Sequence, residues 1–462
     1  MTEGYSDTLV FFGATGDLAH KQVFPALYSM VKHGHLHVPV VGVARQGWSL
    51  EQLKSYAREA VASSEEEINE SAFSRLCDLL RYVDGDYRDP DTFLQVRNTL
   101  GNAGKPLHYL AIPPSMFATA VEGLASSGCA ANARIVVEKP FGRNYASAQS
   151  LNKVLHSVFD ESSIFRIDHF LGKEPVQNLL YFRFANSFLE PIWNRNYVRS
   201  VHMTLAEDFG IGSRGRFYEE VGAIRDVVQN HVLQVISILA MEPPVSADRE
   251  AMRDEKSKVL KSIRPLAADS IVRGQYIGYR NEKGVSSESQ VETFAAAKLY
   301  VDSWRWKDVP FYVRVGKCLA VTVTDVMVEL HPPPLDVFSE GLGEHANFLR
   351  FLLGPSVAIS IGARAKAPGE KMAGEEIELK VVEDISMQMH PYERLLSDAM
   401  RGDTTLFARE DSIEAAWRIV EPVLDSSTPF YQYQPGTWGP DEADRVSPLP
   451  WWLDRIRGKN AS

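Results

Sequence analysis

Cysteine is scarce in this chain of 462 residues, which has only Cys77, Cys129 and Cys318. The three are far apart and form neither a CxxC pair nor the spacing of a Cys/His metal site. A disulfide framework or a structural zinc site would need a larger and more regular set. The cysteine content therefore predicts a protein of a reducing compartment that holds no metal.

Long apolar runs and an excess of positive charge are also missing. No uninterrupted apolar segment reaches the roughly 20 residues of a membrane-spanning helix, and residues 1–7 lack the basic and apolar regions of a signal peptide. The net charge of −11 argues against nucleic acid or an anionic membrane as the main partner. We expect a cytoplasmic protein, in which an anionic substrate would need a local basic pocket.

A glycine turn follows the first expected strand. Residues 8–12 (TLVFF) form a run typical of a strand buried on both faces, and residues 13–19 (GATGDLA) are a GxxGxxA variant of the dinucleotide-binding fingerprint. A helix expected to run to about residue 32 would present free N–H groups to a pyrophosphate. On this motif alone a glycine turn without a ligand is the alternative. The cofactor contacts expected here are Gly13, Thr15, Gly16, Asp17 and Leu18.

Arg45 bears on the choice of cofactor. It follows the second expected strand, residues 37–43, where an acidic residue would bond the ribose 2′-hydroxyl of NAD. An arginine suits the 2′-phosphate of NADP instead, because its guanidinium matches phosphate geometry. The position favours NADP, with NAD possible, and a plain surface cation is the alternative.

Strands and helices alternate through the first 175 residues. Further helices are expected at 50–62, 65–80 and 117–127, strands at 106–112 and 134–137, and a loop at 84–90. This alternation predicts a doubly wound, Rossmann-type parallel sheet in an NADP-binding domain of residues 1–175. Ligands of such sheets lie beyond the carboxyl ends of the strands, where Lys139 would lie as a ligand or as a solubilising residue.

From residue 176 onward the pattern changes to short strands with few intervening helices. The expected strands are residues 198–205, 311–315, 325–330, 347–351, 357–362 and 375–382. They predict a large, mainly antiparallel sheet covered by helices, so that an α+β domain of residues 176–462 follows the α/β domain. A charged, exposed loop is expected at residues 246–257.

Residues 166–174 (RIDHFLGKE) concentrate charge in an unusual way. If they were helical, His169 and Lys173 would share one side and could hold a phosphate dianion, leaving Asp168 to orient a base. The alternative is an exposed helix with a salt-bridged face.

Residues 224–234 (IRDVVQNHVLQ) form a second dense segment. Asp226, Asn230 and Gln234 recur every four residues, so an α-helix would align them on one face with His231 at its flank. A lone histidine is more often structural, but the polar stripe beside it favours a functional site.

These segments resemble, in the same order, those of the glucose-6-phosphate dehydrogenase family. The matching strings are GxxGDLA, LAIPPSMF, VEKPFG, RIDHFLGKE, RDVVQNH, VGK, TLFARED and PGTWGP, spread over nearly the whole chain. The resemblance implies a hydride transfer from C1 of an aldohexose 6-phosphate to NADP, which gives the lactone. It also implies a homodimer or homotetramer, since relatives form dimers through the large sheet.

The resemblance also assigns roles to residues. His231 would be the general base, with Asp168 bonding its other ring nitrogen and stabilising the imidazolium. His169 and Lys173 look like phosphate ligands, and the bond before Pro140 is expected to be cis. The remaining implied contacts are Glu207, Asp226 and Lys317 to the substrate, and Lys139 at the junction of cofactor and substrate.

Three residues depart from the family pattern. Gln22 and Thr322 stand where relatives usually have a basic residue, and Phe170 replaces a tyrosine. Since each lost charge-assisted bond is worth about 1.5–3 kcal/mol when buried, they predict a divergent member with a changed substrate or affinity, unless neighbours compensate. An amino-sugar phosphate substrate is one alternative. A binding protein without turnover is another, although retention of His231 and Asp168 argues against it.

Overall fold

The computed structural model describes residues 4–339, 347–369, 372–382, 389–424, 428–450 and 453. The chain forms two compact units, each assembled from three separate stretches. Unit 1 comprises residues 1–174, 244–254 and 389–414, and unit 2 comprises residues 175–243, 255–388 and 415–462. Residues 1–3 lie outside the described part; they belong to the segment 1–7 that was expected to lack the regions of a signal peptide.

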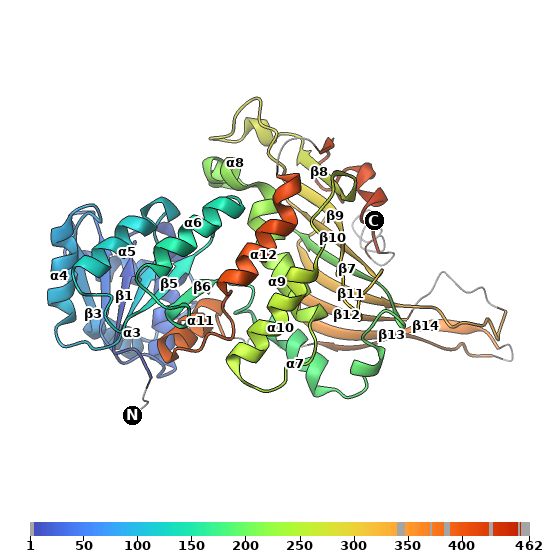
Figure 1. Cartoon of the computed structure of the whole chain (residues 1–462), viewed down its shortest axis with the longest axis horizontal. Helices are drawn as coiled ribbons and strands as arrows, with labels where there is room; N and C mark the ends of the chain where they lie inside the picture. Colours follow the sequence, from blue (N-terminus) through green and yellow to red (C-terminus); the bar gives the residue numbers. More distant parts are fainter. Residues whose placement is uncertain are drawn as a thin grey trace. The chain divides into compact units, whose positions relative to one another are not determined.

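Unit 1 contains a six-stranded parallel sheet in the order β3-β2-β1-β4-β5-β6, which confirms the doubly wound fold (Figure 1). All five residues of β1 are buried, as expected for a strand covered on both faces. The strands are β1 Thr8–Phe12, β2 Val40–Ala44, β3 Leu80–Asp84, β4 Pro106–Leu110, β5 Arg134–Glu138 and β6 Ile164–Ile167.

Two groups of helices cover the sheet of unit 1. Helix α1 packs against α2, α3 and α11. Helix α5 packs against α4 and α6 (Figure 1). Helix α11 belongs to the C-terminal part of the sequence, yet its apolar side chains join the same core as those of α1. The helices are α1 Phe24–Lys32, α2 Leu50–Ala62, α3 Glu70–Leu79, α4 Pro90–Leu100, α5 Phe117–Ser126, α6 Tyr145–His156 and α11 Pro391–Arg401, with a π-helical turn η1 Ala19–Val23 before α1.

Unit 2 contains a nine-stranded sheet in the order β14-β13-β12-β11-β7-β10-β9-β8-β15. Its pairs are antiparallel, as predicted, except that β10 runs parallel to β7 and β15 parallel to β8. The strands are β7 Val198–Ala206, β8 Ile271–Tyr276, β9 Phe294–Tyr300, β10 Pro310–Gly316, β11 Val323–Leu330, β12 Phe348–Gly354, β13 Ala358–Lys366, β14 Gly374–Val382 and β15 Phe430–Tyr433.

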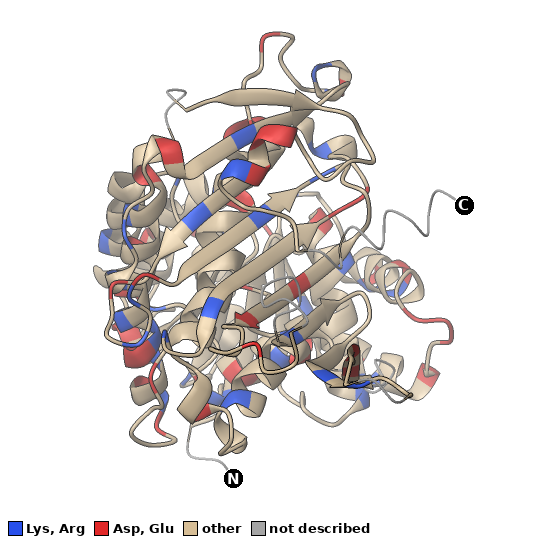
Figure 2. Ribbon diagram, turned by 90° about the vertical axis from the view of Figure 1, so that its right-hand side faces the viewer, with Lys and Arg blue, Asp and Glu red and all other residues tan. Residues whose placement is uncertain are grey.

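Helix α9 covers the centre of one face of this sheet. Its Val235, Ile236 and Leu239 pack with Val201 of β7 and Phe311 of β10, and Figure 2 looks onto the opposite face. Besides short 3₁₀ turns, the helices that the structure describes and that are not listed above are α7 Glu174–Ala185, α8 Gly215–Ala223, the π-helix η6 Ile224–Val232, α9 Leu233–Ala240, α10 Arg249–Ser262 and α12 Glu410–Val420.

One local expectation from the sequence is wrong. Residues 249–262 form α10, where an exposed loop was expected at 246–257. Arg253 of this helix is 2% exposed and pairs with Glu161 at 3.2 Å and with Glu250 at 2.6 Å. Residues 168–173, considered above as a possible helix, form consecutive turns between β6 and α7.

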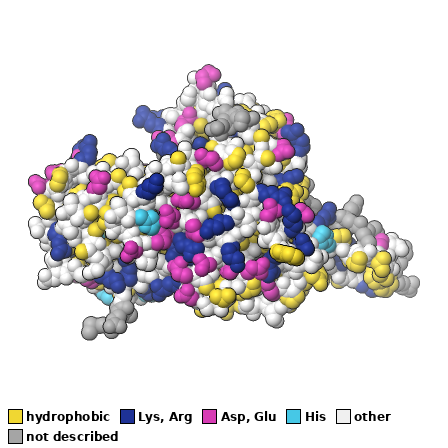
Figure 3. All heavy atoms as spheres, viewed as in Figure 1, with side chains coloured by type: hydrophobic (Ala, Val, Ile, Leu, Met, Phe, Trp, Pro, Cys, Tyr) yellow, Lys and Arg dark blue, Asp and Glu magenta, His cyan; other side chains and the backbone are white. Residues whose placement is uncertain are grey.

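The surface carries both signs of charge. On the face drawn in Figure 3, basic and acidic side chains are interspersed. Among the helices that the structure describes, none has the length and apolar character to cross a membrane.

Replacing Gly13 by alanine should destabilise unit 1 more than replacing Gly47. Both glycines have positive φ, +89° and +67°, so alanine costs about 1–2 kcal/mol of backbone strain at each. A Cβ on Gly13 would lie 2.1 Å from the Ala111 carbonyl oxygen, whereas Gly47 has open space around it. The clash adds about 1–3 kcal/mol. Urea unfolding measures the difference, and equal losses in the two variants would contradict it.

Candidate functional site

The glycine turn of unit 1 offers a cradle for a pyrophosphate. Gly13 N–H donates to the Val43 carbonyl at 2.9 Å and to the Tyr87 hydroxyl at 2.8 Å, while Gly16 N–H donates to the Gly13 carbonyl at 3.0 Å. Helical bonding then begins with His20 N–H to the Gly16 carbonyl at 3.1 Å. The N–H groups of residues 17–19 therefore belong to a first helical turn, which has no intrahelical acceptors for them.

This geometry fits a dinucleotide, since Gly16 and Asp17 are exposed at the start of the helix and no side chain could replace Gly13. The structure thus brings the expected contacts Gly13, Thr15, Gly16, Asp17 and Leu18 into one turn. Tyr87 was not foreseen; its hydroxyl accepts the Gly13 N–H and donates to the Val43 carbonyl at 2.9 Å, which fixes the turn. No local pattern marks it, because both of its partners lie more than 40 positions away.

Arg45 lies directly after β2 with its side chain 66% exposed. It contacts Asp86 at 2.5 Å, and Arg88 contacts the same carboxylate at 2.7 Å. Arg88, and secondarily Arg45, hold the pKa of the Asp86 carboxyl well below its usual range. Two guanidinium groups therefore gather at the carboxyl end of β2, and only Arg45 was expected from the sequence.

Lys139 follows β5, as predicted, and the Lys139–Pro140 bond is cis, which confirms that expectation. Its neighbour Glu138 is only 8% exposed and accepts a hydrogen bond from the Tyr109 hydroxyl at 2.6 Å. Burial raises the pKa of Glu138 to about 7, although Tyr109, Lys139 and Tyr392 oppose the shift. A buried acid next to Lys139 is thus a feature of this site that the sequence pattern did not reveal.

The turns at residues 168–173 bring the two expected phosphate ligands against one aromatic ring. The Lys173 ammonium lies 3.9 Å from the centre of the Phe170 ring, and the His169 ring packs against it at 5.3 Å. Asp168 is 2% exposed, and its Oδ1 accepts the Phe170 N–H at 3.0 Å. Phe170 therefore packs against the Lys173 ammonium and the His169 ring as a tyrosine would, but without the hydroxyl.

In unit 2, Glu207 and Lys317 form an ion pair. They follow β7 and β10, which run parallel, so Ala206 and Gly316 are direct partners and both chains leave the sheet at the same edge. Lys317 is 4% exposed, and its ammonium lies 5.4 Å from the Phe209 ring centre and 5.6 Å from that of Tyr218. This pair was expected at the site, whereas the two aromatic rings around it were not.

Asp226 and His231 lie on η6, which is a π-helix instead of the expected α-helix. Asn230 Nδ2 donates to the carbonyl of Arg225, five residues back, at 3.0 Å, so the expected stripe of every fourth residue does not hold. His231 is 4% exposed, and the π-helix packs against β10. Such wide turns occur frequently at functional sites.

Glu292 anchors the start of this π-helix. Its Oε1 accepts the Ile224 N–H at 3.1 Å, and its side chain fills the space beside Gly222, where a Cβ would lie 2.4 Å from it. Burial raises the pKa of the Glu292 carboxyl. The acid was missed in the sequence because its partner lies 68 positions away.

Thr322, the second cation position that departs from the family pattern, has a local role. Its hydroxyl donates to Asp208 Oδ1 at 2.5 Å and accepts the Asp208 N–H at 3.1 Å. Gln22, the first such position, is half-buried in η1. Thr322 therefore fastens the segment that follows Glu207.

Two family models together span most of the chain. The description "Glucose-6-phosphate dehydrogenase, NAD binding domain" matches residues 10–178, and "Glucose-6-phosphate dehydrogenase, C-terminal domain" matches residues 180–448. Glucose-6-phosphate 1-dehydrogenase 1 of Mycobacterium bovis is 43% identical over 96% of this chain and 95% of its own. Glucose-6-phosphate 1-dehydrogenase of Aggregatibacter actinomycetemcomitans is 38% identical over 95% of each chain.

Solved structures agree with these matches. Glucose-6-phosphate 1-dehydrogenase from Mycobacterium avium has a TM-score of 0.90 and 42% identity, covering 96% of this chain and 97% of its own. A glucose-6-phosphate dehydrogenase in complex with its substrate glucose-6-phosphate has a TM-score of 0.89 and 31% identity, covering 100% and 99%. The fold and the glycine turn define a dinucleotide-dependent oxidoreductase. Within that class, the chain belongs to the glucose-6-phosphate dehydrogenase family.

The raised pKa of Glu138 should make stability depend on pH. The folded state holds this proton more tightly than the unfolded chain, whose pKa is near 4.5, so the contribution is complete below that pH and is lost as pH rises through about 7. Glu138→Gln keeps the neutral form at every pH. Relative to the variant, the wild type should lose about 3 kcal/mol of unfolding free energy between pH 4.5 and 8.

Urea titrations at several pH values measure this difference. Glu122→Gln on α5 is the matched control, because Glu122 is exposed and its replacement should leave the pH profile unchanged. A constant difference between wild type and Glu138→Gln over the whole range would contradict the assignment.

Proposed function

We propose that the chain oxidises the C1 hydroxyl of glucose 6-phosphate, or of a close aldohexose 6-phosphate, and transfers the hydride to NADP to give the 6-phospho-lactone. The observation that carries the proposal is the ion pair of the buried Lys317 with the partly exposed Glu207. Lys317 follows β10, which packs against the π-helix that holds Asp226 and His231. Paired charged groups at a strand edge can bond sugar hydroxyls while Lys317 remains desolvated. Family membership along the whole chain supports the same reaction.

We propose that His231 is the general base. It takes the proton of the C1 hydroxyl as the C1–H bond breaks and a hydride leaves, so the carbonyl of the lactone forms and the proton stays on the imidazole. Asp168 holds the imidazole in the required tautomer and stabilises its cationic form. The burial of both residues, at 4% and 2% exposure, supports these roles because it strengthens their electrostatic effect.

The remaining site residues bind and orient the substrate in this proposal. His169 and Lys173 hold the phosphate, supported by their shared packing on Phe170. The substrate hydroxyls are contacted by Glu207, Asp226 and Lys317, and Lys139 lies at the junction of substrate and cofactor.

NADP, when bound, accepts the hydride on its nicotinamide ring. The glycine turn of residues 13–18 binds its pyrophosphate, to which the first-turn N–H groups of Asp17 and Leu18 donate. Arg45 binds its 2′-phosphate, with Arg88 as a second cation. We assign cofactor binding to residues 1–175 and substrate binding and dimerisation to residues 176–462. NAD is the weaker alternative cofactor.

We propose that the enzyme works as a homodimer or homotetramer in the cytoplasm. Strand β14 supports association through the large sheet, because its Leu379 and Val381 are 63% and 69% exposed. The three cysteines are free thiols, which supports a reducing compartment. Sedimentation of the purified chain gives the number of copies, and a monomer at working concentration would refute the assembly.

The three departures from the family pattern, Gln22, Phe170 and Thr322, bear on which substrate the chain accepts. Two absent cations and one absent hydroxyl, at about 1.5–3 kcal/mol each, would lower the affinity for the usual substrate by orders of magnitude. The alternative is that neighbouring residues compensate for these losses. A panel of hexose 6-phosphates, including an amino sugar, decides between the two: saturation by glucose 6-phosphate at ordinary metabolite levels refutes a changed substrate.

His231→Asn should lower kcat about 10²- to 10⁴-fold with little change in KM, because the base is lost while the binding residues remain. The growth of reduced-nicotinamide absorbance measures it. His202→Asn is the matched control, since His202 is a similarly buried histidine, bonded to Ser200, outside the proposed site. Absence of turnover in the wild type would favour a non-catalytic binding protein. Undiminished turnover in His231→Asn would refute the assignment of the base.

Arg45→Ala should raise the KM for NADP about 10- to 100-fold and leave the KM for NAD unchanged, because only NADP carries the 2′-phosphate. Arg58→Ala is the control, since Arg58 is also partly exposed and is paired with an acid, Glu70. Steady-state kinetics with both cofactors measures the ratio. A parallel loss with NAD and NADP would show that Arg45 acts on the fold instead.

A further inference from the structure

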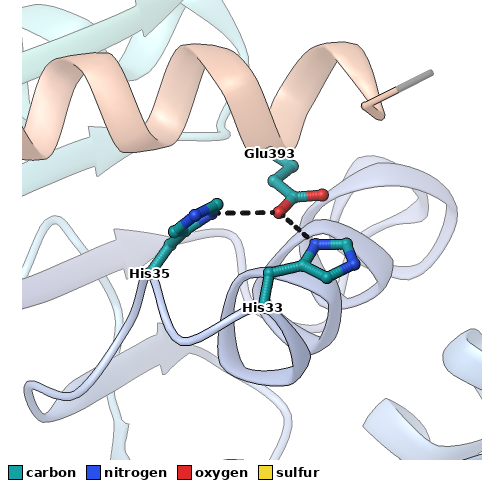
Figure 4. A group of neighbouring side chains, drawn as sticks. All are labelled: His33, His35 and Glu393. Carbon is teal, nitrogen blue, oxygen red and sulfur yellow. Dashed lines mark hydrogen bonds and ion pairs between the residues drawn. The ribbon is translucent and has the colours of Figure 1, made fainter. Parts of the chain in front are cut away.

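Two histidines and a glutamate of unit 1 converge at a place that the proposed reaction does not use. His33 Nδ1 lies 2.8 Å from Glu393 Oε1, and His35 Nδ1 lies 3.4 Å from the same oxygen. The three ligand atoms all lie within 4.8 Å of one another. Figure 4 shows the carboxylate between the two rings, both turned toward it.

The end of α1 creates this arrangement. His33 caps the helix, and Gly34 follows in the left-handed region with φ +76°. His35 N–H then donates back to the Met30 carbonyl at 2.7 Å, which closes the helix in a Schellman-type turn. Tyr5 fixes the backbone further by donating to the His35 carbonyl at 2.6 Å. The negative end of the helix dipole favours a cation at this point.

Glu393 is fully buried and already oriented. Ser29 of α1 donates to its Oε2 at 2.6 Å, so Oε1 is the oxygen that faces the rings. A carboxylate without solvent needs a compensating charge, and the ammonium of Lys32 is bonded to Glu65 at 3.1 Å. His35 Nδ1 is buried as well, and within the described part of the chain it has no hydrogen-bond partner.

We propose that His33, His35 and Glu393 bind a divalent transition-metal ion, with Zn²⁺ as the best fit. Two imidazoles and one carboxylate are a donor set that this ion prefers, with water as the fourth ligand. Bonds of about 2.0–2.1 Å in a tetrahedron place ligand atoms about 3.4 Å apart, which matches the separation of His35 and Glu393. His33 Nδ1 and Glu393 Oε1 are 2.8 Å apart and would separate by about 0.6 Å to admit the ion. The rings are 48% and 39% exposed, so water reaches the open position. Ser29 orients the ligating carboxylate from outside.

A second cluster, of one histidine and two glutamates, shows why such donors alone do not make a metal site. His156 lies 2.9 Å from Glu410 and 3.3 Å from Glu161. Both oxygens of Glu161 already accept hydrogen bonds from Arg166, at 2.8 and 2.9 Å. The permanent charge of an arginine there opposes a metal cation. This cluster is an ion-pair network, and it supplies a control for the metal site.

The metal would connect α1 to α11 across 360 positions of sequence. It would therefore stabilise the docking of the C-terminal stretch 389–414 in unit 1. The proposed metal site is independent of the dehydrogenase reaction, since His33, His35 and Glu393 take no part in that reaction. Sequence spacing could not reveal the site, because its third ligand is far from the His-Gly-His segment.

The full chain, stripped with a chelator and then dialysed, is titrated with Co²⁺ and with Zn²⁺. We expect one equivalent of Co²⁺ to give the visible absorption of a four-coordinate ion, and Zn²⁺ to displace it and raise the Tm. His35→Gln should weaken binding by more than about a hundredfold, because even outer partners of a ligand typically contribute 10- to 100-fold. Ser29→Ala should weaken it about tenfold.

His156→Gln is the matched control and should bind one equivalent with unchanged affinity. His35 is preferred to Glu393 for the test because its ring is partly exposed and its replacement leaves the core intact. Absence of binding in the wild type, or equal affinity in His35→Gln and wild type, would overturn the proposal. Loss of binding in His156→Gln alone would place the ion in the other cluster and overturn it equally.

Discussion

The parallel pairing of β7 with β10 is the constraint on which the substrate side of unit 2 depends. Parallel neighbours end at the same edge of a sheet, so residues 110 positions apart, Glu207 and Lys317, meet as an ion pair. Parallel strands also require a long crossover between them. That crossover contains η6, and with it Asp226 and His231. The pairing of β7 with β10 thus brings Glu207 and Lys317 together, and it requires the crossover that carries Asp226 and His231.

Much of this organisation could be predicted from local sequence. The buried strand at residues 8–12 has the bounds expected from its apolar run, and Gly13 has the positive φ that the fingerprint requires. Six of the nine strands in the sheet of unit 2 were also expected, because a strand with one buried face has a period of two, as in β12. The other three, β8, β9 and β15, were missed. These features are encoded by residues next to one another, which is why they can be read without the fold.

The rest depends on partners far away in the chain. The π-helix that carries His231 begins at Ile224, whose N–H donates to the buried acid Glu292, 68 positions away. Helix α10 includes an arginine that pairs with Glu161, 92 positions away. The sequence predicted the residue types at the candidate site but not their local geometry, as the turns around Phe170 illustrate. The protonation of Glu138 is a further case, since burial by the whole unit raises its pKa.

Unit 1 is completed only by residues near the end of the sequence. Helix α11 shares a core with α1, yet it begins at Pro391, whereas the first strand ends at Phe12. At about 5–20 residues per second, a ribosome needs on the order of 20–80 s to synthesise that interval. During biosynthesis the part of α1 that packs against α11 therefore stays uncovered until α11 has been synthesised. A nascent chain of this architecture offers chaperones a long-lived binding surface on a domain whose sheet is already fully translated.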